Sequence, residues 1–209
     1  MKFNNILVVS PHTDDGELGA GGFIASQIKK GAKVTFLTLC IAEDSVPTGL
    51  DREILGQEAL ESAKSFGLSC EDLIIHRFPV RRLSEHRQEI LEILVALKKN
   101  NYDLILCPSS QDVHQDHSVV YNEVVRAFKG TSILGFDLPW NNLLEQQIFF
   151  YEISYEDLDK KVNSLRCYRS QKFRKYTSQE FLQSLAIIRG AIVGVDLAEK
   201  FEVIRMVVK

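Results

Sequence analysis

Short apolar runs alternate with longer segments of helical periodicity along the chain. The runs that we predict as strands lie at 6–9, 33–40, 73–76, 102–107, 131–136, 147–153 and 198–208. The segments predicted as helices are 17–30, 51–66, 84–99, 118–128, 155–168 and 178–189. Strands that alternate with helices of this length are typical of βαβ units, so the pattern predicts an α/β fold with a mostly parallel sheet. No linker rich in Pro, Gly or Ser divides the pattern, and we expect one domain over 1–209.

Small and polar residues mark several of the predicted helix ends. Asp51 is expected to cap the helix that reaches about 66, and Ser84 is expected to cap the next helix. Gly31 and Gly67 stand where the first two helices should end.

The first predicted helix is unusually rich in glycine. Its glycines are Gly16, Gly19, Gly21 and Gly22. Their spacing does not match the dinucleotide-binding fingerprint, and acidic side chains stand where a pyrophosphate would bind. We therefore expect these glycines to let the helix pack closely on the sheet.

Composition and charge exclude several classes of partner. The chain of 209 residues is 45% hydrophobic and 25% charged, as is usual for a globular protein. The formal net charge of −3 and the lack of a Lys/Arg-rich run argue against nucleic acid as a partner. No stretch of 18 apolar residues predicts a membrane span, and no signal region precedes the first strand, so a cytoplasmic location is expected. The four cysteines form no Cys-x-x-Cys pair and are expected to be reduced core residues.

Histidines and carboxylates follow two of the predicted strands. After 6–9 come His12, Asp14, Asp15 and Glu17, and after 102–107 come His114, Asp116 and His117. If these strands are neighbours in a parallel sheet, both loops lie at its carboxyl edge, where open α/β folds place their active sites. Two imidazoles and one carboxylate, with a position left for water, are a common catalytic zinc site. The same donor set also suits Fe(II).

The other polar residues of these loops have the chemistry of a hydrolase. Zinc held in this way acidifies a water molecule and polarises a carbonyl group. Asp14, adjacent in sequence to a ligand, is placed to take a proton from that water. His114, near the metal but not on it, is expected to stabilise the developing oxyanion, with Asp116 holding its tautomer.

Other interpretations of the same residues stay open. Single His and Asp residues in loops are mostly solvated, and Asp14-Asp15 would suit a helix N-terminus, although three of the five histidines fall in these two loops. A metal- or sugar-binding protein without catalysis would need neither a base nor an oxyanion donor. A phosphoesterase would want a second metal about 4 Å away, for which Glu17 and Asp112 are the nearby spare carboxylates.

The segment from Pro11 to Gly22, together with His114 to His117, resembles the PIG-L/LmbE-like family of zinc-dependent N-deacetylases. That family carries a His-Pro-Asp-Asp-x-Glu motif after its first strand and a later His-x-Asp-His motif. Weaker likeness at 57–67, 168–171 and 198–202 extends the resemblance over nearly the whole chain. The resemblance implies a Rossmann-like three-layer sandwich with a mostly parallel sheet.

The resemblance also implies ligands, roles and a reaction. The implied zinc ligands are His12, Asp15 and His117. Asp14 would be the general base, and His114, supported by Asp116, the oxyanion stabiliser or acid. The reaction would remove an N-acetyl group from a small N-acetylglucosamine-type conjugate, and family members often form homo-oligomers. Hydrolysis of another small amide at the same site is the alternative.

Three positions depart from the family pattern. Thr13 replaces a usual Pro, and Ala42 stands where a Gly is frequent after the second strand. The arginine commonly found three residues before the helical Glu would fall at Leu55, so Arg52 is the expected substitute for that substrate contact. The catalytic half of the pattern is thus intact and the substrate-recognising half is not, and we expect the loop at Trp140 to contribute to a different pocket.

Overall fold

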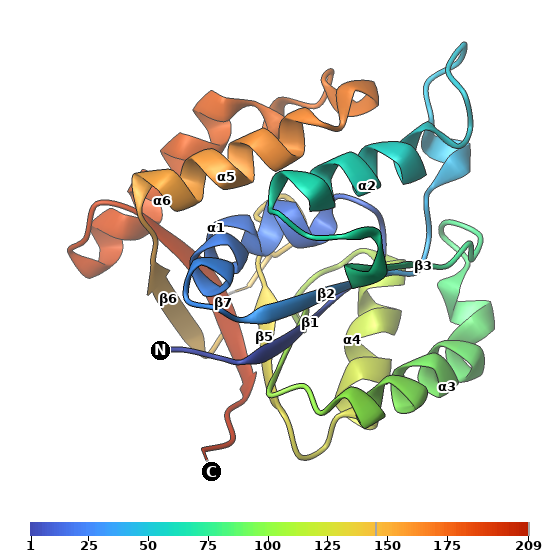
Figure 1. Ribbon diagram of the computed structural model, residues 1–209, viewed down its shortest axis with the longest axis horizontal. Coiled ribbons are helices and arrows are strands. Elements are labelled where there is room, and N and C mark those ends of the chain that lie inside the picture. The colour runs from blue at the N-terminus through green and yellow to red at the C-terminus, as the bar shows by residue number, and fades with distance from the viewer. Residues whose placement is uncertain (145, 209) are drawn as a thin grey trace.

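A seven-stranded sheet forms the centre of the molecule in the computed structural model, which describes residues 1–144 and 146–208 (Figure 1). The strands are β1 (Asn5–Ser10), β2 (Lys33–Thr38), β3 (Leu73–Ile75), β4 (Leu104–Pro108), β5 (Ser132–Phe136), β6 (Ile148–Glu152) and β7 (Ala198–Arg205). They lie in the order β3-β2-β1-β4-β5-β7-β6, with the first five parallel and β7 antiparallel to both of its neighbours. The mostly parallel sheet predicted from the sequence is confirmed, and only residues 145 and 209 of the expected domain lie outside the described part.

Helices cover both faces of the sheet. On one face lie α1 (Asp15–Lys29), α2 (Ile54–Ser65), α5 (Tyr155–Arg166) and α6 (Gln179–Val193), and on the other lie α3 (Arg87–Leu97) and α4 (Gln115–Ala127) (Figure 1). This arrangement is the predicted three-layer α/β sandwich. In the described residues no helix is long and apolar enough to cross a membrane.

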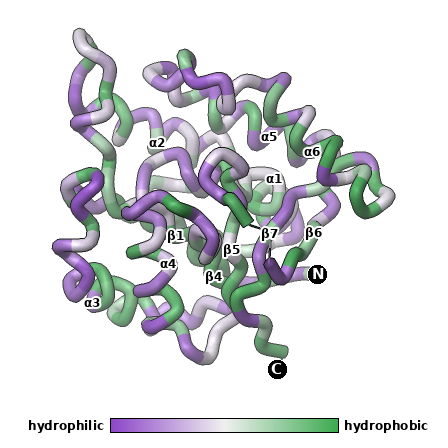
Figure 2. The backbone as a smooth tube through the Cα atoms, turned by 180° about the vertical axis from the view of Figure 1, so that it is seen from behind, coloured by the Kyte–Doolittle hydropathy of each residue, from purple (hydrophilic) through white to green (hydrophobic). Residues whose placement is uncertain are grey.

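The two faces of the sheet contribute to separate hydrophobic cores. Along β1, Ile6 and Val8 belong to the core under α1, whereas Leu7 and Val9 belong to the core under α3 and α4. Because both faces of this central strand are buried, it consists of one continuous apolar run instead of an alternating pattern. The outer helices are amphipathic, and Figure 2 shows hydrophobic and hydrophilic residues alternating along α3.

The glycines of α1 allow the close packing predicted for them. A Cβ atom at Gly16 would lie 2.8 Å from Val8 of β1, and one at Gly19 would lie 2.5 Å from Phe136 of β5. On its outer side, a Cβ at Gly21 would lie 2.7 Å from Lys161 of α5. Any side chain at these positions would therefore push the helix away from its neighbours.

Some helix ends differ from the prediction because other groups form the caps. Asp51 does not cap α2: its carboxylate accepts the backbone N–H of Glu53 in a turn, and the helix begins at Ile54. Ser84 lies inside a 3-10 turn that precedes α3. The helix α4 begins earlier than predicted because the His114 imidazole accepts the backbone N–H of Asp116, which brings Asp116 and His117 into the first turn.

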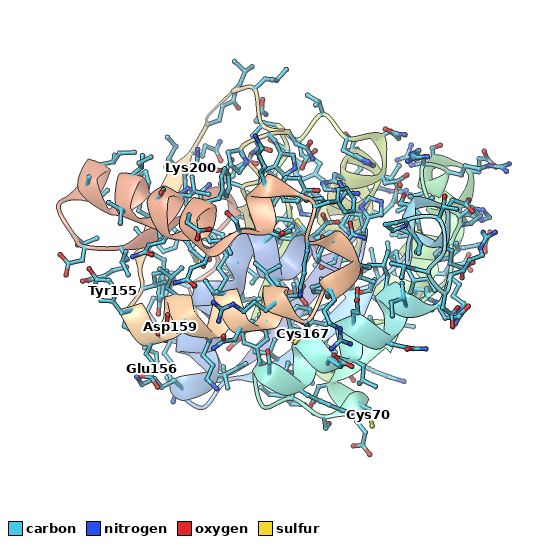
Figure 3. The ribbon with its side chains drawn as sticks, turned by 90° about the horizontal axis from the view of Figure 1, so that it is seen from above. Cys70, Tyr155, Glu156, Asp159, Cys167 and Lys200 are labelled. Carbon is cyan, nitrogen blue, oxygen red and sulfur yellow. The ribbon has the colours of Figure 1, made fainter. Side chains whose placement is uncertain are left out.

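The prediction for the cysteines is confirmed in part. All four are free thiols, and Cys40 and Cys107 are buried as expected. Cys167 is partly exposed, and Cys70 is exposed in the 3-10 turn before β3, at the periphery of the molecule (Figure 3). The prediction that it lies in the core was therefore wrong, because its turn lies outside the sheet.

Candidate metal and active site

The two polar loops meet at one edge of the sheet. β1 and β4 are neighbouring parallel strands, with Ile6 paired to Leu104. The chain continues from β1 to β2 and β3 on one side and from β4 to β5 on the other, so the loops after β1 and β4 flank the point where the strand order reverses. In open α/β folds this switch point is the place where ligands bind. The expected convergence of the two loops is confirmed.

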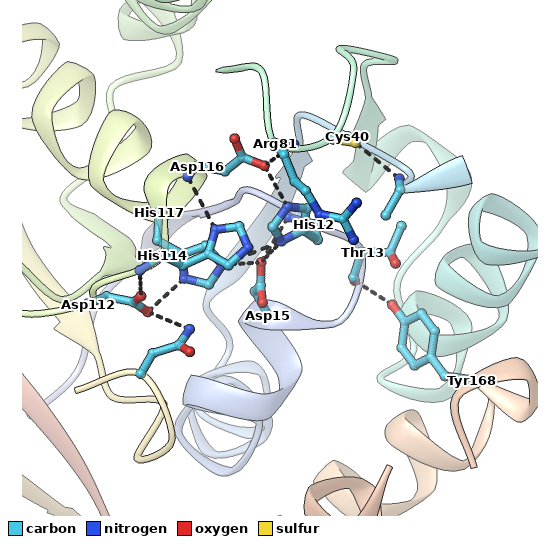
Figure 4. Close-up of polar contacts among 12 residues, drawn as sticks. His12, Thr13, Asp15, Cys40, Arg81, Asp112, His114, Asp116, His117 and Tyr168 are labelled. Carbon is cyan, nitrogen blue, oxygen red and sulfur yellow. Dashed lines mark hydrogen bonds and ion pairs between the residues drawn. The ribbon is translucent and has the colours of Figure 1, made fainter. Parts of the chain in front are cut away.

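Three side chains from these loops present their polar atoms to one point (Figure 4). Oδ2 of Asp15 lies 3.1 Å from Nδ1 of His12 and 3.3 Å from Nε2 of His117. The two ring nitrogens lie 3.4 Å from each other. These are the atoms of the three residues that the sequence predicted as ligands, and two of the side chains, those of Asp15 and His117, are buried.

Two further carboxylates hold the histidine rings in place. Asp116 contacts Nε2 of His12 at 3.0 Å, and Asp112 contacts Nδ1 of His117 at 2.7 Å. An ionised carboxylate only accepts hydrogen bonds, so the hydrogen of each ring stands on the nitrogen that faces it. The lone pairs of the other two nitrogens therefore point at Asp15 and at each other. Histidine ligands of metals are usually oriented in this way.

Such an arrangement requires a positive charge among the three atoms. Burial alone would lower the pKa of His12, but Asp15 and Asp116 raise it to about 9. Burial likewise opposes the charge on His117, but Asp15 and Asp112 raise its pKa to about 10. A cation can take the place of these protons. Bonds of about 2.1 Å in a tetrahedral zinc site set ligand atoms about 3.4 Å apart, so the spacing fits zinc.

Asp14 lies beside this cluster in the wall of the pocket. It is the N-cap residue of α1, but its side chain accepts no capping hydrogen bond from the helix. Burial and the charge of Asp15 raise the pKa of Asp14 to about 6, against smaller opposite effects of His12 and Arg174. The carboxylate is therefore suited to accept a proton near neutral pH.

His114 also faces the pocket, but it is held differently from the prediction. The Asp116 carboxylate, expected to fix the His114 tautomer, contacts His12 instead. The backbone N–H of Asp116 donates to Nδ1 of His114 at 3.2 Å, so Nε2 of His114 carries the hydrogen. Burial and the nearby His117 lower the pKa of His114, which favours the neutral ring. A neutral imidazole with Nε2–H remains a hydrogen-bond donor.

A pocket of about 290 Å³ opens in front of the cluster. One part of its wall is apolar and includes Leu55, Val80 and Ala42. Trp140 is also part of this wall, stacked on Tyr176, so the loop at Trp140 belongs to the same pocket as the candidate metal ligands.

The arginine expected to contact the substrate, Arg52, does not line this pocket. Arg52 lies on the exposed surface in an ion pair with Asp44, at 2.5 Å, and lines a separate shallow hollow with Pro47 and Leu50. The prediction that it contacts substrate is not supported by this position. Arg81 and Arg174 line the pocket instead.

Several residues of the site were not assigned from the sequence. Asp112, which the sequence offers only as a spare ligand for a second metal, precedes His117 by five residues and contacts its ring. Arg81 adopts a left-handed backbone conformation, with φ of 65°, and its N–H donates to Asp116 at 2.7 Å. Tyr168, in the segment after α5, donates to the Thr13 carbonyl at 2.5 Å and so supports the loop after β1. No local sequence signal distinguished Arg81, whereas Tyr168 fell in a segment of family likeness.

Fold and site together define an α/β protein with a candidate metal site at the switch point of its sheet. Residues 7–128, more than half of the chain, match the family described as PIG-L, GlcNAc-PI de-N-acetylase. The chain therefore belongs to the PIG-L family, a family of deacetylases. It is also similar to the uncharacterized deacetylase YaiS of Escherichia coli (strain K12), with 25% identity over 178 residues that cover 81% of this chain and 92% of that protein.

Solved structures share the fold. N,N'-diacetylchitobiose deacetylase from Pyrococcus horikoshii superimposes with a TM-score of 0.81 at 19% identity, over 97% of this chain and 84% of that one. GalB, the 4-carboxy-2-hydroxymuconate hydratase from Pseudomonas putida KT2440, has the same TM-score of 0.81 at 18% identity, over 99% and 98% of the two chains. One fold thus carries two reactions, and the reaction must be argued from the site.

Proposed function

We propose that this protein is a zinc-dependent hydrolase that removes the N-acetyl group from a small amino-sugar derivative. The observation that carries the proposal is the convergence of two oriented histidine nitrogens and the Asp15 carboxylate. Beside them lies Asp14, whose side chain forms no capping hydrogen bond with α1. Membership in a deacetylase family and the fold shared with a chitobiose deacetylase support the same reaction. Fe(II) suits the same donors, so the native metal is part of what the experiment must establish.

His12, Asp15 and His117 would hold the metal in this proposal. When bound, zinc acidifies a water molecule and polarises the amide carbonyl. The Asp14 carboxylate accepts the proton of the attacking water, and the water oxygen forms the new bond to the carbonyl carbon. His114 donates its Nε2–H to the oxyanion that develops there. The C–N bond then breaks, the amine leaves with a proton from Asp14 or His114, and acetate remains.

The test is acetate release from a panel of N-acetylated amino sugars, free and conjugated. The chain is first treated with a chelator and then assayed with and without added zinc or Fe(II). Release that disappears with the chelator and returns with one metal ion per chain supports the proposal. One bound metal per chain without release from any member would overturn the amino-sugar assignment, and two metals per chain would favour a phosphoesterase.

A further inference from the structure

Two stacked aromatic rings, those of Trp140 and Tyr176, form one part of the pocket wall. The Trp140 and Tyr176 rings stack with their centroids 4.1 Å apart and their planes 15° from parallel. Trp140 comes from the segment after β5 and Tyr176 from the 3-10 turn before α6, and both line the pocket. Trp140 is the single tryptophan of the chain, and 38% of its surface is exposed. A flat ring face of this kind suits the apolar face of a sugar ring or another planar group.

Arg174 is fixed next to this face by neutral partners. Its Nε donates to the Gln171 side-chain oxygen at 2.5 Å, and a terminal nitrogen donates to the Tyr176 hydroxyl at 2.6 Å. Neither partner carries a negative charge, so the hydrogen bonds orient the guanidinium without neutralising it. Only part of its hydrogen-bonding capacity is used, since a guanidinium has five N–H donors.

The pocket arginines lack the carboxylate partner that several arginines of the surface have. Arg52, Arg77 and Arg82 each form an ion pair with a carboxylate. Within residues 1–144 and 146–208, neither Arg81 nor Arg174 does so. Figure 4 shows Arg81 beside His12, on the metal side of the pocket. Arg174 lies near enough to the Asp14 carboxylate to interact with it, but the two form no ion pair. Two cations without ion-pair partners in one pocket favour a negatively charged ligand.

The apolar part of the wall limits what else the pocket can recognise. Leu55 and Val80 offer no hydrogen-bonding group to sugar hydroxyls, and Leu55 is nearly fully buried. Neutral polar groups such as Ser45 and Asn141 line other parts of the wall, but only the charged and aromatic groups can discriminate among ligands by charge and by ring shape. Of these, Arg174 is the one held in a fixed orientation beside the aromatic face.

We infer that Arg174, with the Trp140–Tyr176 face, forms a subsite for a carboxylate or phosphate carried by the amine-bearing part of the substrate. This inference rests on the proposed function for its substrate, but the binding of an anionic ligand does not depend on turnover. A charge-assisted hydrogen bond to a guanidinium favours a charged ligand by about tenfold or more over a neutral analogue. The ring next to the anionic group would lie on Trp140.

The test compares three glycosides of N-acetylglucosamine on the zinc-loaded chain: the methyl glycoside, the carboxymethyl glycoside and the 1-phosphate. Binding is followed by the fluorescence of Trp140 after rapid mixing, before turnover, and acetate release is measured separately. We expect the two anionic ligands to bind about tenfold or more tightly than the methyl glycoside. The carboxylate and phosphate arms show which anion is preferred.

Variants locate the charge that makes the difference. Arg174→Met should reduce the affinity ratio between anionic and neutral ligands to about one, Arg174→Lys should keep part of it, and the exposed Arg52→Met should keep all of it. Equal binding of the three ligands by the wild-type chain would overturn the inference. So would an affinity ratio that survives in Arg174→Met, or one lost only in Arg81→Met. Acetate release without a preference for anionic ligands would contradict the subsite and support the proposed function. A preference for anionic ligands without acetate release would support the subsite and contradict the proposed function.

Discussion

Asp14 is the residue whose replacement should separate metal binding from catalysis. It lines the pocket beside the three candidate ligands, and its side chain forms no capping bond with α1. Asp14→Asn keeps the size of the side chain and removes the proton acceptor. We expect zinc to stay at one ion per chain while kcat/KM for deacetylation falls by about 10²–10⁴-fold. Metal content by atomic absorption and acetate release by a coupled assay give the two numbers.

Arg52→Gln is the matched control for this variant, because it also removes one charge, but at an exposed position outside the pocket. Its kcat/KM should stay within about twofold of the wild-type value, since surface changes away from a site have small effects. If Asp14→Asn retained full turnover, Asp14 would not be the base.

Asp112 should control the affinity for metal although it is not itself a proposed ligand. It accepts from Nδ1 of His117 at 2.7 Å and so directs the other nitrogen of that ring towards Asp15. An amide at this position, in Asp112→Asn, is a weaker acceptor for the ring N–H. Zinc affinity, measured by competition with a fluorescent chelator, should fall by about 10–100-fold. Unchanged affinity would show that the orientation of His117 does not depend on Asp112, and Asp44→Asn on the surface is the control.

For single residues, the sequence predicted which side chains lie together at the site but not which atoms contact each other. His12, Asp15 and His117 were found because the type and spacing of donors after two strands are local features. Asp116 lies at the start of α4, where its backbone N–H and its carboxylate point to different histidines. Its carboxylate was therefore assigned to the wrong ring. Arg52 lies outside the pocket for a similar reason: its proximity in sequence to α2 does not show which side of the loop faces the pocket.

Replacing a glycine by alanine should have opposite effects on stability in α1, which packs closely on the sheet, and in α2, which leaves room for a side chain. In Gly19→Ala the added Cβ would lie 2.5 Å from the fully buried Phe136, so the helix or the ring must move. We expect a loss of stability of about 1–3 kcal/mol. In Gly56→Ala of α2 the Cβ meets Ile41 at an ordinary 3.7 Å, and we expect a gain of about 0.5 kcal/mol. Urea unfolding of both variants measures this difference, and equal stabilities would contradict the packing described for α1.

Elements were more predictable than their contacts. The apolar runs predicted the strands because strands buried on both faces need unbroken apolar sequence. The helix starts were less accurate, since caps such as the His114 ring depend on tertiary position. The weaker family segments at 57–67 and 168–171 have a structural reason for their likeness: Ser170 donates to the Glu58 carboxylate at 3.0 Å through its backbone and 2.6 Å through its side chain. This contact links α2 to the turn after α5, next to Tyr168 and the site loop.

The pocket is a property of the whole molecule. Its wall combines groups that follow β1, β2, β3, β4, β5 and α5. Predicting it requires the order of the strands and the path of each connection, and the sequence supplied only the parallel pairing of strands. This explains why Arg81, Arg174 and Tyr176 were not foreseen as neighbours of His12. The family pattern gave the candidate catalytic residues but gave no guide to these three positions.

Metal binding should stabilise the whole fold, because the candidate ligands join the two halves of the sheet. His12 follows β1 and His117 lies in α4 after β4, 105 residues later in the chain. An ion held by both binds the folded chain and not the unfolded one, so zinc at 100 times its Kd should add about 2.7 kcal/mol. For a chain of this length that corresponds to a rise in Tm of about 5–11 °C. Scanning calorimetry with and without zinc measures the shift, and the His12→Ala chain should lose most of it. An equal rise in His12→Ala would place the stabilising ion elsewhere and remove the proposed metal site from the switch point.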